Sequence, residues 1–178
     1  MTVAFTVAHP VKHRAELLEL NIEYVTWVMD GIEKMMGAQA VDVLGAPVPE
    51  YVAATLEKVA GDPPPRGAFY IVEVDGNLAG MGGLRYLQPG LAEIKRVYVR
   101  PGFRGMKLGG TILARLLQDA TAFGYRRAVL DTASFMDSAQ RLYEAMGFVD
   151  CPIYEGVEVP PAFQKNWRFM ERSLATAS

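Results

Sequence analysis

The pattern of apolar and polar positions divides the chain into a helical amino-terminal part and a part rich in strands. After residues 2–8, which alternate like a strand, apolar residues recur at helical spacing from Leu17 to Ile32. This pattern predicts a first helix that is interrupted near Gly31 or Gly37. A second helical pattern begins at Pro49 and must end at the proline-rich residues 61–67, because proline cannot continue a helix.

From Phe69 onward the pattern changes to strands. Residues 69–74, 78–87 and 92–99 read as three strands separated by turns of sequence DGN and QPG. Short turns between consecutive strands predict an antiparallel meander.

The remaining pattern predicts a crossover connection. A helix is expected from Leu108 to about Phe123, followed by a strand over residues 126–132. The order strand, helix, strand is the connection that parallel pairing requires. A short helix over residues 138–146 and two late strands, near 148–154 and 165–174, complete the chain. We therefore expect one domain over residues 1–178, of class α/β (α+β), with a mixed and mostly antiparallel sheet flanked by helices.

Composition and charge exclude several classes of protein. The 178 residues are 51% hydrophobic and 21% charged, which is typical of a globular domain. A formal net charge of −2 provides no basic field for a nucleic-acid backbone, so no nucleic-acid partner is expected. No apolar stretch resembles a signal peptide or a membrane span, so we expect no membrane partner and a cytoplasmic location. Cys151 is the single cysteine, which leaves no disulfide, and no metal site is expected.

The segment from Val97 to Gly110 carries the strongest chemical signal. It runs from a strand through a basic, glycine-bearing loop into the start of a helix. Glycines allow a close approach of the backbone, and the helix amino terminus offers unpaired N–H groups and a positive dipole end. Arg104 and Lys107 add positive charge. The segment lacks the Walker A pattern and the spaced glycines of a dinucleotide fold. It predicts a ligand that contains pyrophosphate, although an ordinary turn from strand to helix would also give this pattern.

Two segments resemble the GNAT superfamily of N-acetyltransferases. RGMKLGG at residues 104–110 resembles that family's pyrophosphate loop, with Arg104 and Gly109 in place but Lys107 where glycine is usual. SAQRLYEAMGF at residues 138–148 resembles the family's A-x-x-L-Y-x-x-x-G-F helix, although Met136 stands where an asparagine is common. The resemblance is strongest over residues 67–174.

The resemblance implies acetyl-CoA as cosubstrate, bound in a central splay of the sheet. The pantetheine arm would pair with the strand that ends in Val97, Tyr98 and Val99, as an added strand does. An amide near Val97 would stabilise the oxyanion, a contact worth about 3 kcal/mol. The pyrophosphate would lie on the loop that contains Arg104, Gly105, Met106, Lys107, Leu108, Gly109 and Gly110.

Two residues are candidates for the proton transfers. The attacking amine must lose a proton, and Glu93 is the candidate base, at a spacing where some relatives carry a glutamate. Simple alternation places Glu93 on the same face of its strand as Val97 and Val99. Glu93 would otherwise be a solvated carboxylate or the ion-pair partner of a neighbouring basic residue, Lys95 or Arg96. Bound water and Glu73 are alternative bases. Tyr143 matches the family's tyrosine that protonates the departing thiolate, and otherwise would be a core aromatic residue.

The acceptor side is the least defined by the sequence. The resemblance implies a pocket shaped by the first helices and by the loop before the last strand, where the candidate lining residues are Trp27, Asp30, Glu33, Met35 and Met36. The predicted function is direct acetyl transfer from acetyl-CoA to a primary amine of a small molecule or protein. A CoA-binding sensor without catalysis, a protein-interaction module on the same fold, and an enzyme for longer acyl groups are the alternatives. A homodimer is possible, as symmetric pairs are common.

Overall fold

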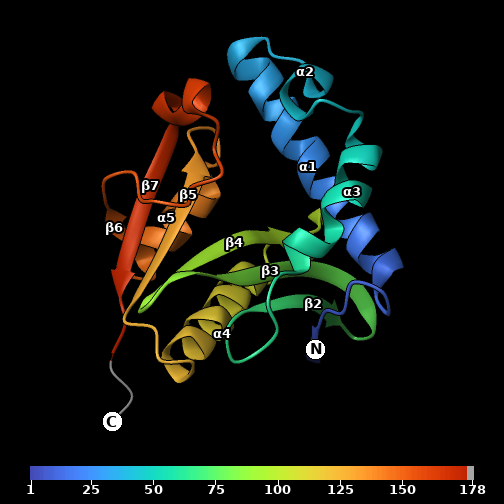
Figure 1. Cartoon of the computed structure of the whole chain (residues 1–178). Helices are drawn as coiled ribbons and strands as arrows, with labels where there is room; N and C mark the ends of the chain where they lie inside the picture. The colour runs from blue at the N-terminus through green and yellow to red at the C-terminus, as the bar shows by residue number, and fades with distance from the viewer. Residues whose placement is uncertain (176–178) are drawn as a thin grey trace.

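The computed structural model describes residues 1–175, which form one layered domain (Figure 1). The helices are α1 (Arg14–Met36), α2 (Ala40–Leu44), α3 (Val48–Ala60), α4 (Leu108–Ala122) and α5 (Asp137–Ala145), and short 3-10 turns cover Pro101–Phe103 and Pro161–Asn166. The strands are β1 (Val3–Val7), β2 (Ala68–Val74), β3 (Asn77–Gln88), β4 (Leu91–Val99), β5 (Arg127–Ala133), β6 (Val149–Asp150) and β7 (Trp167–Ser173). Within residues 1–175 no helix is both long and apolar enough to cross a membrane.

The strands form one sheet in the order β1-β2-β3-β4-β5-β7-β6. The expected antiparallel meander of β2, β3 and β4 is confirmed, and β4 pairs with β5 in parallel, as the crossover predicts. The parallel pairing ends at Glu93 and Val129, although β4 continues to Val99 and β5 to Ala133. The two strands then diverge, which Figure 1 shows as a wide angle between β4 and β5. The sheet is therefore mixed, mostly antiparallel and splayed at its centre.

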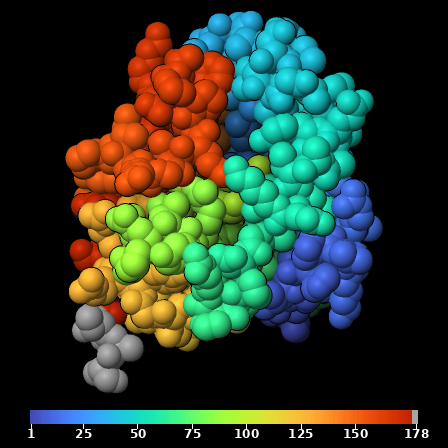
Figure 2. All heavy atoms as spheres, in the orientation of Figure 1, coloured from blue at the N-terminus to red at the C-terminus, as the bar shows by residue number. Residues whose placement is uncertain are grey.

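Two apolar cores cover the two faces of the sheet. Ile112 and Leu116 of α4 pack on one face, in a cluster that also contains Tyr143 of α5. Leu17 of α1 and Leu56 of α3 pack on the other face, with Met81 of β3. Figure 2 shows the surface hollowed between the α1–α3 segment, in blue to cyan, and the segment before β7, in red. The helices thus leave the splayed part of the sheet accessible.

Three elements differ from expectation, two in their boundaries and one because no helix was expected there. Helix α1 runs through Gly31 and ends at Gly37, whose left-handed φ of 72° terminates it. The ring of Phe135 lies where a side chain at position 31 would be, so tertiary packing accounts for this glycine within the helix. The strand expected near 148–154 is limited to β6, and helix α2 was not predicted.

A β-bulge in β4 changes which residues share a face. Arg96 has a φ of 52°, and the pairing with β3 moves from Gly83–Lys95 to Met81–Tyr98 across it. Before the bulge, Ile94 packs on the α4 side, so its neighbour Glu93 faces the other side. After the bulge, Val97 and Val99 pack on the α4 side. The expectation that Glu93 shares a face with Val97 and Val99 is therefore wrong.

Candidate active site

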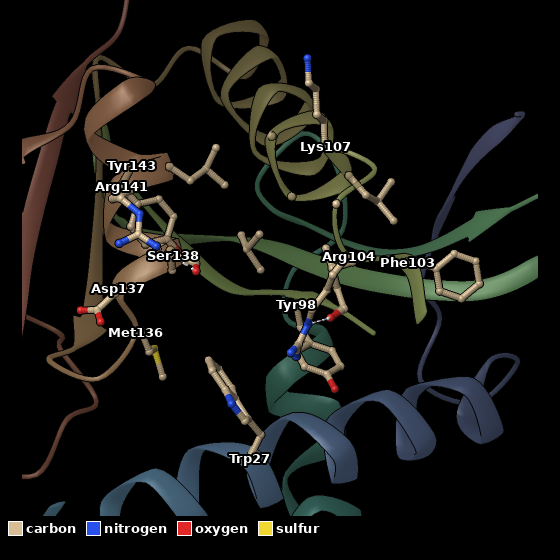
Figure 3. A pocket seen from close by; sticks show the side chains of 18 of the residues that line it. Trp27, Tyr98, Phe103, Arg104, Lys107, Met136, Asp137, Ser138, Arg141 and Tyr143 are labelled. Carbon is tan, nitrogen blue, oxygen red and sulfur yellow. Dashed lines mark hydrogen bonds between the residues drawn. The ribbon is translucent and has the colours of Figure 1, made fainter. Parts of the chain in front are cut away.

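A cleft of about 670 Å³ opens where β4 and β5 separate (Figure 3). One wall comes from the end of β4 and the start of α4, and the opposite wall comes from α5 and the loop before it. The cleft is lined by Trp27, Val97, Tyr98, Val99, Phe103, Arg104, Gly105, Lys107, Leu108, Gly109, Gly110, Phe135, Met136, Asp137, Ser138, Ala139, Arg141, Leu142 and Tyr143. Every residue predicted to bind the cofactor lines the cleft except Met106, whose side chain is exposed.

The amino terminus of α4 forms one end of the cleft. Lys107 is the N-cap residue, and the first backbone bond of the helix runs from the Thr111 N–H to the Lys107 carbonyl at 3.2 Å. The preceding N–H groups of the first turn have no partner within the helix, so they are available to an anion. A Cβ atom on Gly109 would lie 3.4 Å from the side chain of Leu142. Helices α4 and α5 therefore come close together at this end of the cleft.

The backbone at Lys107 is left-handed, a conformation that glycine adopts most readily. Its φ of 59° and ψ of 16° lie in the left-handed region, and Gly105 also has a positive φ of 82°. Lys107 therefore adopts a conformation that costs a residue with a side chain about 1–2 kcal/mol. In Figure 3 the Lys107 side chain points away from the cleft, whereas Arg104 lies beside it. The Arg104 Nε donates to the Val99 carbonyl at 3.3 Å.

The edge of β4 beyond Glu93 forms the second part of the cleft. This edge faces β5 without strand pairing, so its peptide groups are available to an extended ligand. Val97, Tyr98 and Val99 lie on this segment. The Tyr98 ring also packs on Tyr24 and Trp27 of α1, at centroid distances of 5.9 and 6.4 Å. Tyr98 thus packs on α1 and also lines the cleft, where the sequence predicted it.

Tyr143 lies on the opposite wall, on α5. The residue is only 7% exposed, and it faces the wall that carries Tyr98 and Arg104 (Figure 3). Burial raises the pKa of its hydroxyl well above the ordinary value, and the nearby groups of Tyr24 and Asp131 add to this effect. Its hydroxyl forms no hydrogen bond with another residue in the described part of the chain. The phenol therefore stays protonated and can donate to a ligand in the cleft.

Helix α5 begins without a side-chain cap. Met136 is its N-cap residue and lines the cleft, and it stands where the resembled family often has asparagine. The Gln140 side chain donates to the Ala133 carbonyl at 2.8 Å and so fixes the start of the helix to the end of β5. Gln140 therefore anchors the start of α5, the helix that carries Tyr143, to the end of β5.

Glu93 lies at the apex of the splay, outside the set of residues that line the cleft. It is 3% exposed. Its Oε1 accepts a hydrogen bond from Arg85 Nε at 3.1 Å and forms an ion pair with Arg85 Nη2 at the same distance. Burial raises the pKa of Glu93, an effect that Arg85 partly offsets. Glu93 forms an ion pair with neither Lys95 nor Arg96, the two partners considered from the sequence. Arg96 instead donates to Asn21 Oδ1 at 2.8 Å. Burial lowers the pKa of Lys95 to about 8. Glu93 is thus a paired, enclosed carboxylate.

Two other groups of predicted residues lie apart from the cleft. Glu73 lies on β2, where it pairs with Ala4 of β1. Strand β2 is two strands away from β4 in the sheet, so Glu73 is remote from the opening. The exposed Glu33 accepts a hydrogen bond from Gln39 at 2.7 Å. Met35 accepts one from Ser134, which joins α1 to the loop after β5. Of the acceptor-side candidates, only Trp27 lines the cleft.

Sequence reasoning missed a buried polar cluster beside the cleft. Asp131 of β5 accepts from Trp167 Nε1 at 3.1 Å and from the Tyr154 hydroxyl at 3.3 Å. The same hydroxyl lies 3.1 Å from Glu93 Oε2. The signal was present, because Asp131 is the one charged residue within the apolar run AVLDTA, and a charge in such a run needs a reason. Phe135 was also missed, since its position depends on its contact with α1.

Comparisons with known proteins agree with this architecture. A family model described as the Acetyltransferase (GNAT) family matches residues 37–148. An uncharacterized N-acetyltransferase from Schizosaccharomyces pombe is 40% identical over 72 residues, which are 40% of this chain and 44% of that protein. Another from Escherichia coli is 31% identical over 87 residues, 47% of this chain and 52% of that protein. The match therefore spans about half the length of these curated relatives.

Solved structures share the fold at low sequence identity. The PaiA N-acetyltransferase of Thermoplasma acidophilum, in complex with coenzyme A, has a TM-score of 0.69 at 18% identity and covers 97% of this chain and 99% of its own. An acetyltransferase from Streptococcus agalactiae has a TM-score of 0.67 at 20% identity, covering 97% and 98%. The family model covers more than half of the sequence, and the splayed sheet, the α4 loop and the α5 helix are all in place. The chain belongs to the GNAT family of acetyltransferases.

Proposed function

We propose that this protein transfers an acetyl group from acetyl-CoA to a primary amine by direct attack in a ternary complex. The observation that carries the proposal is the cleft, which joins three features: the unpaired edge of β4, the open amino terminus of α4 and the buried hydroxyl of Tyr143. These features match the extended arm, the pyrophosphate and the thioester of one cosubstrate. The complex of the Thermoplasma relative with coenzyme A supports this choice of ligand.

The pyrophosphate binds at the loop before α4. The N–H groups of Leu108, Gly109 and Gly110 and the positive end of the helix dipole favour an anion there. Arg104 adds a formal charge from the same wall of the cleft. The Lys107 ammonium, which points away from the cleft, contributes to the field around the loop rather than to a direct contact.

The pantetheine arm extends along β4 toward the apex of the splay. An amide near Val97 then polarises the thioester carbonyl and stabilises the oxyanion, as preorganised backbone donors do. Tyr143 faces this segment from α5 and gives its proton to the departing sulfur. The nucleophile is the neutral amine, so no covalent acyl-enzyme is needed.

The amine must lose a proton before it attacks. Glu93 remains a predicted base, but it has little exposed surface and already forms an ion pair with Arg85.

Binding of acetyl-CoA is the first test. Isothermal titration of the purified protein should show micromolar binding, and Arg104→Ala should weaken it by tenfold or more. Lys34→Ala is the matched control, because Lys34 lies in the last turn of α1 outside the cleft. Equal affinity in all three proteins would remove Arg104 from the site, and no binding would overturn the proposal.

Thiol release across a panel of primary amines then tests catalysis. Release of CoA that depends on both the amine and acetyl-CoA supports transfer. Tight binding of acetyl-CoA without release for any amine in a broad panel would favour the CoA-sensing alternative. Faster release from butyryl-CoA than from acetyl-CoA would identify a longer acyl group as the donor.

A further inference from the structure

A second carboxylate, Asp131, lies in the opening of the sheet. The pairing of β4 with β5 ends at Glu93 and Val129, and Asp131 is the next residue on that face of β5. Asp131 keeps part of its surface exposed, whereas Glu93 is only 3% exposed. Of the two carboxylates at the apex, Asp131 is therefore the more exposed.

The contacts of Asp131 leave its charge uncompensated. Its Oδ1 accepts from Trp167 Nε1, and its Oδ2 accepts from the Tyr154 hydroxyl. That hydroxyl has one proton but lies within hydrogen-bond distance of both Asp131 and Glu93. Arg85 neutralises Glu93, but no lysine or arginine of residues 1–175 forms an ion pair with Asp131.

The surroundings of Asp131 connect it to the cleft. The Trp167 ring, which donates to Asp131, packs on Phe135 at a centroid distance of 6.5 Å, and Phe135 packs on Trp27 at 6.1 Å. Both Phe135 and Trp27 line the cleft. The charge of Asp131 also contributes to the raised pKa of Tyr143. Trp167 and Phe135 thus link Asp131 to the lining of the cleft through packed aromatic rings.

We propose that Asp131 binds the ammonium group of the acceptor and accepts its proton, and that Glu93 is a positioning residue that acts on Asp131 through Tyr154. The assignment rests on the proposed acetyl transfer and names the acceptor as a primary ammonium ion.

The proton balance of the reaction follows from this arrangement. The ammonium nitrogen gives its first proton to the Asp131 carboxylate, and the neutral amine attacks the thioester carbonyl carbon. As the C–S bond breaks, Tyr143 gives its hydroxyl proton to the sulfur. The resulting tyrosinate then takes the second proton from the nitrogen. Asp131 then releases its proton to solvent, so that the products are the amide, CoA thiol and one proton.

The electrostatic environment suits this role. Burial, followed by the charge of Glu93, raises the pKa of Asp131 to about 7, which is near the ideal for a base at neutral pH. The ionisable groups that surround it are Glu93 of β4, Arg85 of β3, Tyr154 and Glu158 of the segment before β7, Tyr24 of α1 and Tyr143 of α5. The negative charges among them hold the proton on Asp131 after it has been transferred.

The test compares Asp131→Asn with Glu93→Gln in the full chain, using benzylamine as acceptor. The wild-type kcat/KM should rise to a plateau with an apparent pKa of about 7. Asp131→Asn should lose about 10²-fold or more at pH 7. The kcat/KM of Asp131→Asn should instead continue to rise with pH up to the pKa of the amine itself. In Glu93→Gln the rise of kcat/KM should move to lower pH, because removal of the Glu93 charge lowers the pKa of Asp131.

A second acceptor separates proton transfer from damage to the fold. O-benzylhydroxylamine has the same ring but is neutral at pH 7, so Asp131→Asn should lose less than tenfold with it. Both variants should bind acetyl-CoA as the wild type does. The assignment would be overturned if Asp131→Asn kept the wild-type dependence of kcat/KM on pH. It would also be overturned if Asp131→Asn lost equal activity with both amines. Binding of acetyl-CoA without thiol release in the wild type would instead overturn the proposed transfer itself.

Discussion

Gly31 of α1 lies directly against the ring of Phe135, so that a Cβ atom at position 31 would be 2.3 Å from the ring. Phe135 follows β5 and lines the cleft, so this contact joins the two sides of the splay. A glycine within a helix costs up to about 1 kcal/mol relative to alanine. Here the glycine allows a close approach that no other residue permits.

The first prediction concerns this contact. Gly31→Ala should destabilise the protein by about 1–2 kcal/mol, because the cost of overpacking exceeds the gain in helix propensity. Urea unfolding measures the change. In the Phe135→Leu background the same substitution should be neutral or stabilising, since the ring is gone. An additive double variant would show that the ring is not the cause.

The second prediction concerns the left-handed backbone at Lys107. Lys107→Gly and Lys107→Ala remove the same charge, but only glycine relieves the strain of a φ of 59°. The glycine variant should be more stable than the alanine variant by about 1 kcal/mol in urea unfolding. Their affinities for acetyl-CoA should agree within about twofold, because the loop keeps its shape. Greater stability of the alanine variant would contradict this reading of the loop.

The third prediction concerns Tyr143. Tyr143→Phe should lower kcat by about 10²-fold and leave acetyl-CoA binding unchanged, because it removes only the proton donor. Burial raises the pKa of Tyr143, so the wild-type rate should show no loss from its ionisation below pH 10. Tyr125→Phe is the control, since that hydroxyl donates to the Arg66 carbonyl away from the cleft. Unchanged turnover in Tyr143→Phe would remove it as the acid.

The fourth prediction concerns stability against pH. The pKa of Asp131 is raised to about 7 in the native state, against about 3.9 in an unfolded chain. The native state therefore holds a proton that the unfolded state releases, and stability is lost as pH rises from about 4 to 7. Asp131→Asn avoids this loss, on the order of 4 kcal/mol.

Urea unfolding of both proteins at pH 5 and pH 8 provides the measurement. The stability advantage of Asp131→Asn should be larger at pH 8 than at pH 5. A constant difference between the two proteins would mean that Asp131 titrates normally in the native state.

The fifth prediction concerns the pair of Arg85 and Glu93. Arg85→Met leaves Glu93 enclosed without its counter-charge and should destabilise the protein by about 3–5 kcal/mol. The double variant Arg85→Met/Glu93→Gln should recover much of this loss. A double variant as unstable as the single one would show that the cost arises from packing alone.

The order and type of the main elements could be predicted from the sequence, because their apolar periods are long and regular. This holds for the meander of β2, β3 and β4, for α4, and for β5, which pairs with β4 in parallel. The loop before α4 was also predictable, since glycine and basic residues mark it. The left-handed backbone at Lys107 was not predictable, because lysine gives no sign of a positive φ.

The side of the strand on which Glu93 lies could not be predicted in the same way. The bulge at Arg96 reverses the alternation, yet arginine gives no sign of the positive φ that glycine or asparagine would suggest. The Asp131 cluster depends on Tyr154 and Trp167, which lie in segments distant in sequence. Such contacts arise from the tertiary fold and have no local pattern.

The short parallel ladder between β4 and β5 has a mechanical consequence. Only three residue pairs join these strands, so each half of the sheet can change its angle relative to the other at little cost in hydrogen bonds. A cosubstrate that occupies the gap would form hydrogen bonds in place of the absent strand pairing. It would thereby hold the two halves of the sheet at a fixed angle. Amide hydrogen exchange in β4 and β5 should then slow on binding, and the melting temperature should report the acetyl-CoA concentration.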